Sequence, residues 1–201
     1  NDVATTSHAY VTPGSYDVKL AAITDYGCKS DTTIHAVVVG AIPQAGYTVS
    51  TPVCAGKTIT FTDNSNGNGN TLNQWTWDFG DGPPVVATTN APQTHSFVTT
   101  GPHTVTLQVK TTTGCVSQIF SQTVNVNPNP VADFTLPASI CLPAGAAQFT
   151  STSTISDGTA NLFGYAWTFG DGGTSSAQNP LHNYTTTGTY SVGLTITSNN
   201  G

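Results

Sequence analysis

The chain has 201 residues, 37% of them hydrophobic, and a formal net charge of −6 from ten acidic and four basic residues. Thirty-seven residues are Thr, whereas Arg, Glu and Met are absent, so strand-forming residues outnumber good helix formers. With no basic stripe to neutralise phosphates we expect no nucleic-acid partner, and with no run of about 18 apolar residues we expect no membrane span.

The sequence repeats itself with a period of 87 residues, which is long enough for a small independent domain. The shift relates Cys28 to Cys115; Cys54 to Cys141; His8 to His95 and His182; Tyr10 to Phe97 and Tyr184; Gly14 to Gly101 and Gly188; and Pro43 to Pro130. Because the sequence opens with Asn1 rather than a start Met and shows no signal peptide, we expect a segment of a longer, processed chain.

The repeat predicts three domains. Residues 1–40 are expected to be the C-terminal part of a first domain, residues 41–127 a complete domain, and residues 128–201 a domain that lacks its last strand. Short Pro-containing linkers separate them, and such linkers restrict the angle between neighbours. We therefore expect a semi-rigid array.

Apolar and polar residues alternate in several short runs, which is typical of half-buried strands. In chain order the alternating apolar residues are Tyr16, Val18 and Leu20; Ile59 and Phe61; Trp75 and Trp77; Val105, Leu107 and Val109; Val124 and Val126; and Tyr190, Val192, Leu194 and Ile196. About seven strands per domain, with turn signals between them, predict an all-β fold of tandem immunoglobulin-like β-sandwiches without significant helix.

Large aromatic residues precede a repeated Gly-Asp-Gly triplet. Each Trp alternates in phase with the Phe two positions later, so we expect both side chains to point into the sandwich. The triplets predict turns, because Gly adopts positive φ freely and a carboxylate accepts backbone N–H groups. The expected core residues are Trp77, Phe79, Trp167, Phe169, Tyr16 and Tyr190. The expected turn residues are Gly80, Asp81 and Gly82, and Gly170, Asp171 and Gly172.

The segments Trp75-Thr-Trp77-Asp-Phe79-Gly-Asp-Gly82 and Tyr165-Ala-Trp167-Thr-Phe169-Gly-Asp-Gly172 resemble the signature of the polycystic kidney disease (PKD) domain. The later elements His182-Asn-Tyr184 and Gly188-Thr-Tyr190 agree with it, although the first domain lacks its Trp segment. The resemblance implies a sandwich found in surface proteins, in archaeal S-layer proteins and in accessory modules of secreted hydrolases. The Cys pattern looks most like the PKD arrays of Bacteroidota surface proteins and adhesins.

Acidic residues are candidates for a calcium site or a catalytic pair. Asp78 and Asp81 lie close together in the sequence and near Asp63, and oxygen ligands and paired carboxylates serve those purposes. In the next copy Thr168 replaces Asp78, whereas Asp171 is kept. Paired-carboxylate chemistry is therefore not repeated, and we interpret these residues as turn caps.

Histidines offer no better case for chemistry. His8, His95 and His182 share the 87-residue phase, but one histidine per domain does not make a zinc site, so a strand histidine bonded to backbone is favoured. No Gly-x-Ser-x-Gly, Gly-rich phosphate loop or His-Glu-x-x-His occurs. The sequence therefore predicts no catalytic residues, no metal and no cofactor.

A few aromatic positions stay open. Tyr16 and Tyr190 resemble a tyrosine corner at the start of a late strand, but His103 takes that place in the middle domain, which leaves its corner in doubt. Most aromatic residues fall in the inward phase. Tyr26, Tyr47 and Phe163 are the candidates for exposure.

The four cysteines favour disulfides over zinc, because they lie 26, 61 and 26 residues apart. In an immunoglobulin-like sandwich Cys54 belongs where the chain leaves the domain and Cys115 where it enters, about 25 Å away, whereas a disulfide needs Cα atoms about 4.4–6.8 Å apart. We expect each early Cys to pair with the late Cys of the following domain, which for Cys54 is the position after Gly201. Cys28, Cys115 and Cys141 would then find partners outside this segment, and a Cys54–Cys115 pair is the alternative.

These features predict a non-enzymatic extracellular repeat segment of a large cell-surface fibre, stalk or adhesin. The alternative is a polysaccharide- or protein-binding accessory module of a secreted hydrolase; a eukaryotic receptor ectodomain is disfavoured by the Cys pattern. The expected partners are neighbouring repeats, laterally associated copies, and a surface glycan or protein. Asp31-Thr32-Thr33 is similar to the short O-glycosylation motif of Bacteroidota, which makes Thr32 a candidate acceptor.

Overall fold

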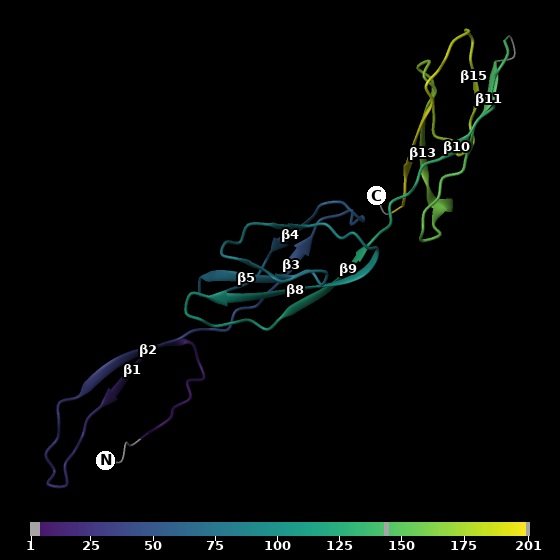
Figure 1. The fold of residues 1–201 in the computed structure, drawn as a ribbon. Coiled ribbons are helices and arrows are strands. Elements are labelled where there is room, and N and C mark those ends of the chain that lie inside the picture. The colour runs from purple at the N-terminus through teal and green to yellow at the C-terminus, as the bar shows by residue number, and fades with distance from the viewer. Residues whose placement is uncertain (1–4, 143–144, 200–201) are drawn as a thin grey trace. The chain divides into compact units, whose positions relative to one another are not determined.

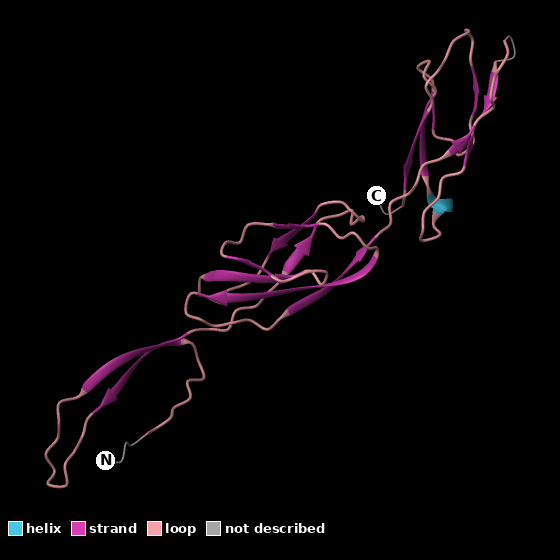
Figure 2. Ribbon diagram, viewed as in Figure 1, coloured by secondary structure: helices cyan, strands magenta, loops and turns pink. Residues whose placement is uncertain are grey.

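In a computed structural model of the chain, the structure describes residues 5–142 and 145–199, and they form short β-strands joined by loops (Figures 1 and 2). The only helical element within those ranges is a three-residue 3-10 turn, Ala160–Leu162. The strands with a defined residue-to-residue pairing run antiparallel to their neighbours. The predicted all-β fold is confirmed. No helix in the described ranges is long and apolar enough to cross a membrane.

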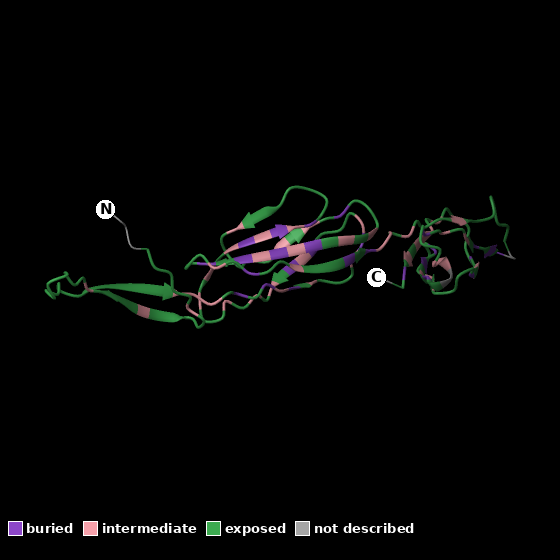
Figure 3. Cartoon of the chain, turned by 90° about the horizontal axis from the view of Figure 1, so that it is seen from below, coloured by how far each residue is buried: buried purple, intermediate pink, exposed green. Residues whose placement is uncertain are grey.

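The first part of the chain is a hairpin of β1 (Gly14–Leu20) and β2 (Thr33–Val39). Its register places Tyr16 opposite Val37. Most of its side chains are exposed, Leu20 to 73% and Val38 to 67%, and the hairpin carries almost only the colour of exposed residues in Figure 3. An 87-residue shift maps β1 and β2 onto the last two strands of the middle domain.

The middle domain contains seven strands. They are β3 (Tyr47–Val49), β4 (Ile59–Asp63), β5 (Leu72–Asp78), β6 (Val85–Ala87), β7 (Gln93–His95), β8 (Gly101–Thr111) and β9 (Phe120–Val126). One sheet has the order β3-β4-β7 and the other the order β6-β5-β8-β9. The strand count and the two sheets agree with the predicted sandwich.

Aromatic rings join the two sheets of the middle domain. Tyr47 on β3 lies 5.2 Å, centroid to centroid, from Trp77 on β5, and Phe61 on β4 lies 5.0 Å from Phe79. Inward residues of β8 are fully buried at alternate positions, with Val105 and Leu107 both at 0% exposure. The alternation read from the sequence therefore follows the pleat of the strands, because successive side chains point to opposite faces.

The third domain repeats this arrangement with shorter strands. They are β10 (Phe134–Thr135), β11 (Ala146–Gln148), β12 (Thr150–Ser151), β13 (Gly164–Thr168), β14 (Thr174–Ser175), β15 (Leu181–Asn183) and β16 (Gly193–Thr197). β12 pairs with β10, and β11 pairs with β15. The second sheet has the order β14-β13-β16, so within the described ranges it has no counterpart of β9.

The strand predicted over Tyr190–Ile196 begins later than expected, at Gly193. β16 pairs with β13, whose last residue, Thr168, lies opposite Gly193. The equivalent strand β8 begins at Gly101 and has β9 on its other side. In the third domain Tyr190 and Val192 pack against the core from irregular backbone.

Candidate functional site

The Gly-Asp-Gly turn of the third domain is closed by a side-chain pair. Nε2 of His182, on β15, lies 2.8 Å from Oδ2 of Asp171. The other carboxylate oxygen, Oδ1, accepts the N–H of Gly173 at 2.9 Å. The hydrogen bond from His182, followed by that from Gly173, holds the pKa of the Asp171 carboxyl below its ordinary value. The expectation of a histidine bonded to backbone is wrong for His182, because its partner is a carboxylate.

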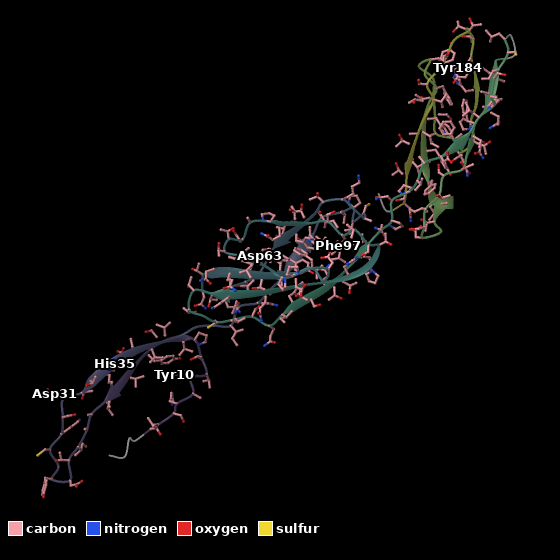
Figure 4. All side chains as sticks on the ribbon, viewed as in Figure 1. Tyr10, Asp31, His35, Asp63, Phe97 and Tyr184 are labelled. Carbon is pink, nitrogen blue, oxygen red and sulfur yellow. The ribbon has the colours of Figure 1, made fainter. Side chains whose placement is uncertain are left out.

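The same histidine covers the aromatic core. The His182 ring stacks on Phe169 at 4.0 Å with an interplanar angle of 8°, and Tyr184 donates its hydroxyl to the carbonyl of Phe169 at 3.0 Å. Tyr184 is labelled on this domain in Figure 4. Burial raises the pKa of its phenol. Trp167 donates its indole N–H to the carbonyl of Ala177 at 2.9 Å. One turn, one strand and the core are thus joined through a few polar contacts.

The two Gly residues of the middle-domain turn differ from those of the third domain in backbone conformation. Gly80 has φ +81°, and a Cβ at this position would lie 2.8 Å from the carbonyl oxygen of Thr104. Gly170 has the same φ and would meet Ser191. Gly172 also has a positive φ, whereas Gly82 has not and is surrounded by open space. Only the first Gly of the middle triplet therefore uses the positive φ that Gly permits.

A carboxylate caps the middle turn as well. Asp78 accepts the N–H of Gly80 at 2.9 Å, and Asp81 lies exposed in the turn itself. Asp63 instead accepts the N–H of Ser65 at 3.0 Å. Within the described ranges, no three His, Cys, Asp or Glu side chains are grouped as metal ligands.

Four of the six expected core residues are almost fully buried, namely Trp77, Phe79, Trp167 and Phe169. Each Trp stacks on the Phe that follows it, at 6.1 Å in the middle domain and 6.4 Å in the third. Tyr190 is partly buried against the core. Tyr16 packs on Tyr10 in the exposed hairpin, with ring centroids 4.4 Å apart.

The corner at the start of the late strand is present in all three copies. Tyr16 donates its hydroxyl to the carbonyl of Thr12 at 2.8 Å, and Tyr190 does the same to Thr186 at 3.0 Å. In the middle domain Nε2 of His103 lies 2.9 Å from the carbonyl oxygen of Thr99. The imidazole therefore reaches the acceptor that a tyrosine reaches elsewhere, and the doubt about this corner is resolved by the structure.

Of the three aromatic residues expected on the surface, Tyr26 is exposed to 96%, whereas Tyr47 and Phe163 are buried at 4% and 9%. The expectation is wrong for both buried residues. Tyr47 donates its hydroxyl to the carbonyl of Val105 at 2.9 Å, so a polar group could be buried at no great cost. Burial raises the pKa of this phenol to about 12.

The cysteines lie at opposite ends of the middle domain's last strand. Cys54 forms a parallel bridge with Asn127, just after β9, and Cys115 lies in the loop before β9. A Cβ on Gly40 would be 2.8 Å from Cys115 Sγ. Cys28 and Cys141 are exposed. Both the pairing between domains and its Cys54–Cys115 alternative stay predictions.

The candidate glycosylation site lies apart from these turns. Thr32 is exposed and immediately precedes β2. Its neighbours Asp31 and His35 are labelled on the hairpin in Figure 4.

Sequence reasoning had not linked Asp171 with His182. Both residues had been noted, one as a turn cap and the other as part of the 87-residue phase. A signal was available, because a Gly-Asp-Gly triplet is followed by an in-phase His in both the middle and third domains. Pairing them required the knowledge that β15 passes beside the turn.

Two antiparallel sheets packed around a buried Trp are typical of immunoglobulin-like modules. The family model described as "PKD domain" matches residues 40–126 and again residues 127–201. The matches cover most of the sequence, and the chain belongs to the PKD domain family. PKD domains are generally non-catalytic modules.

The chain is similar to a part of the pre-pro-metalloprotease PrtV of Vibrio cholerae serotype O1 (strain M66-2), with 45% identity over 51 residues. This match covers 25% of the chain and 6% of that protein. Among solved structures it is similar to the PKD1 domain of Vibrio anguillarum Epp (22% identity, TM-score 0.39, 45% of this chain and 100% of that chain). It is also similar to the PKD1 domain of the V. cholerae metalloprotease PrtV (23%, 0.37, 43% and 98%).

Proposed function

We propose that the chain is a non-enzymatic, extracellular structural or adhesive repeat segment of a large cell-surface fibre, stalk or adhesin. The observation that carries the proposal is the use of the polar signature residues inside each domain. The Asp171–His182 pair closes a turn, and the corner residues bind backbone carbonyls. These contacts all lie within a domain and join its turns and strands, as expected of groups with a structural role.

The aromatic residues support the same proposal. Modules that bind polysaccharides present aromatic rings to solvent, because sugar faces stack on them. Among the Phe, Tyr and Trp residues of the described ranges, Tyr26 alone is mostly exposed. It lies in the turn between β1 and β2 rather than on a sheet face.

Antibody labelling of intact cells tests the proposal. An antibody raised against this chain should label the surface of intact source cells, and the labelled protein should sediment with the cells as a high-molecular-mass species. Recovery of the antigen only in the culture medium, on a protein with hydrolase activity, would contradict the proposal.

The second candidate is an accessory module of a secreted hydrolase. The observation that favours it is the similarity to a metalloprotease of V. cholerae. Retention of the chain on chitin, cellulose or collagen supports this candidate if Tyr26→Ala abolishes it and Tyr26→Phe does not. Because Tyr26 is 96% exposed, neither substitution should disturb folding.

A further inference from the structure

The loop between β4 and β5 of the middle domain contains two Asn-Gly pairs in succession, Asn66-Gly67 and Asn68-Gly69. Asparagine is a chemically labile residue, and it loses its side-chain amide most readily before glycine, because glycine has no Cβ to hinder its own backbone nitrogen. Both asparagines are exposed, so water reaches both side chains alike. Their hydrogen bonds therefore decide which pair can react.

The first pair is held on several sides. The N–H of Asn66 donates to the carbonyl of Gln44 at 2.8 Å, and the carbonyl of Asn66 accepts the N–H of Gln44 at 2.7 Å. Oδ1 of Asn66 accepts the N–H of Asn68 at 2.8 Å. The Gly67 nitrogen can reach Cγ of Asn66 only if the peptide unit between the two residues rotates, and this rotation breaks the bond to Gln44.

The second pair lies at the centre of a tight turn, which the N–H of Asn70 closes by donating to the carbonyl of Gly67 at 3.0 Å. Asn68 and Gly69 have φ +50° and +86°, as expected for the central residues of a type I′ turn. Among the residues that the structure describes, neither the Asn68 carbonyl nor the Gly69 N–H has a hydrogen-bond partner. The peptide unit between them can therefore rotate without breaking a backbone hydrogen bond.

The side chain of Asn68 holds the loop to the segment that precedes β3. Its Nδ2 donates to the carbonyl of Ile42 at 2.7 Å. Nδ2 of Asn70 lies 3.4 Å from the carbonyl oxygen of Ala41 and adds a second, longer contact. The amide group of Asn68 is thus the closer of two links between the loop and residues 41–42.

We propose that Asn68 is a site of spontaneous deamidation and isomerisation, and that its conversion releases the loop from the segment before β3. Hydroxide removes the proton of the Gly69 N–H while the nitrogen forms a bond to Cγ of Asn68. The bond from Cγ to Nδ2 then breaks, and Nδ2 takes a proton from water and leaves as ammonia. Water opens the resulting succinimide at either carbonyl carbon, which gives aspartate or isoaspartate without oxidation or reduction.

The product has a carboxylate where the amide was. An ionised carboxylate only accepts hydrogen bonds, so it cannot donate to the carbonyl of Ile42. In isoaspartate the main chain also runs through the side-chain carbons of residue 68, which displaces the turn. The inference concerns the chemistry of the chain and does not depend on the proposed surface role.

Peptide mapping of the folded chain over time tests the proposal. After incubation at mildly alkaline pH, chymotrypsin cleaves after Phe61 and Leu72 and releases one peptide with both Asn-Gly pairs, in which tandem mass spectrometry locates each converted residue. We expect conversion at Asn68 to be about tenfold faster than at Asn66 or more, because reaction at Asn66 must first break its bonds to Gln44. In urea, where the chain is unfolded, both asparagines should react at similar rates.

Two variants with the same added charge test the effect on the loop. Asn68→Asp removes the donor to the carbonyl of Ile42, whereas Asn66→Asp keeps an oxygen that accepts the N–H of Asn68. Hydrogen exchange of the Gln44 amide, next to the released segment, should become about three- to tenfold faster in Asn68→Asp. Exchange of the same amide in Asn66→Asp should stay close to that of the wild-type chain.

Three results would overturn the proposal. Equal conversion of Asn66 and Asn68 in the folded chain would show that both react only after unfolding. Conversion of Asn68 in urea but not in the folded chain would show that the bond to Ile42 protects the amide. Unchanged exchange of the Gln44 amide in Asn68→Asp would show that this bond does not hold the loop.

Discussion

His182 and Asp171 close the Gly-Asp-Gly turn of the third domain, with the histidine Nε2 2.8 Å from the aspartate Oδ2. The two residues are eleven positions apart, because Asp171 lies in the turn and His182 on β15. The pair fixes the turn to β15 while the imidazole plane stacks on Phe169. The carboxylate therefore does more than cap its own turn.

We expect Asp171→Asn to remove part of the acid sensitivity of the third domain. Because hydrogen bonds from His182 and Gly173 lower the folded-state pKa of the Asp171 carboxyl below 3.8, its stabilising contribution is fully present above that value. The contribution is lost as the pH falls through the lower, folded-state pKa. Hydrogen exchange at the Gly173 amide between about pH 2 and about pH 6 measures this. Asp25→Asn, in the hairpin turn, is the control, and an unchanged acid limb would refute the expectation.

Gly80→Ala should destabilise the middle domain by about 1–3 kcal/mol, because it combines a positive φ with a clash against Thr104. Gly82→Ala supplies the matched control. That residue has neither a positive φ nor an atom within 4 Å of an added Cβ, so the change should be neutral or slightly stabilising. Urea denaturation of both variants measures the difference, and equal losses of stability would contradict the structure.

The corner of the middle domain should accept a tyrosine. His103→Tyr places a hydroxyl where the other copies use it, and we expect it to retain the bond to the Thr99 carbonyl that His103 makes at 2.9 Å. His103→Phe keeps a ring but loses the donor, which should cost about 0.5–1.5 kcal/mol relative to His103→Tyr. Thermal unfolding of the two variants provides the comparison. A Phe variant as stable as the Tyr variant would show that the bond contributes nothing.

Tyr47→Phe should lower the free energy of unfolding by about 1–3 kcal/mol at neutral pH, because the buried Val105 carbonyl loses its donor. The substitution should also change how the free energy of unfolding depends on pH in the alkaline range. Since burial raises the folded-state pKa of Tyr47 from 10.0 to about 12, the wild-type chain loses stability as the pH rises from the lower value through the higher one. Tyr47→Phe removes this loss, which chemical denaturation across that range detects. Tyr26→Phe removes an exposed phenol and should leave the alkaline pH dependence of stability unchanged.

Periodicity carried most of the fold prediction. The inward direction of Trp77 and Trp167 could be predicted from the sequence. Side chains at every second position of a strand point to the same face, and the face that carries the large apolar side chains is the buried one. The 87-residue shift likewise placed Gly14 and Cys28 at the positions of Gly101 and Cys115 in the middle domain. Both features depend on local pattern, which the sequence contains in full.

Features that depend on which strands meet could not be read in this way. Tyr47 was expected at the surface, yet it lies between two sheets because β3 faces β5 and β8 across the sandwich. His103 was seen only as a missing tyrosine, since its bond to Thr99 depends on the ring's reach and not on residue type. The start of β16 at Gly193 depends on its pairing with β13, which no single strand's sequence specifies.

The parallel bridge between Cys54 and Asn127 has a mechanical consequence. Residues 53–55 come early in the middle domain and Asn127 at its end, and two backbone hydrogen bonds join them in a parallel arrangement. Tension on the chain would load these bonds together in shear instead of opening them one after another. A domain closed in this way yields at a higher force than a hairpin pulled from its open end, where each ladder bond breaks alone.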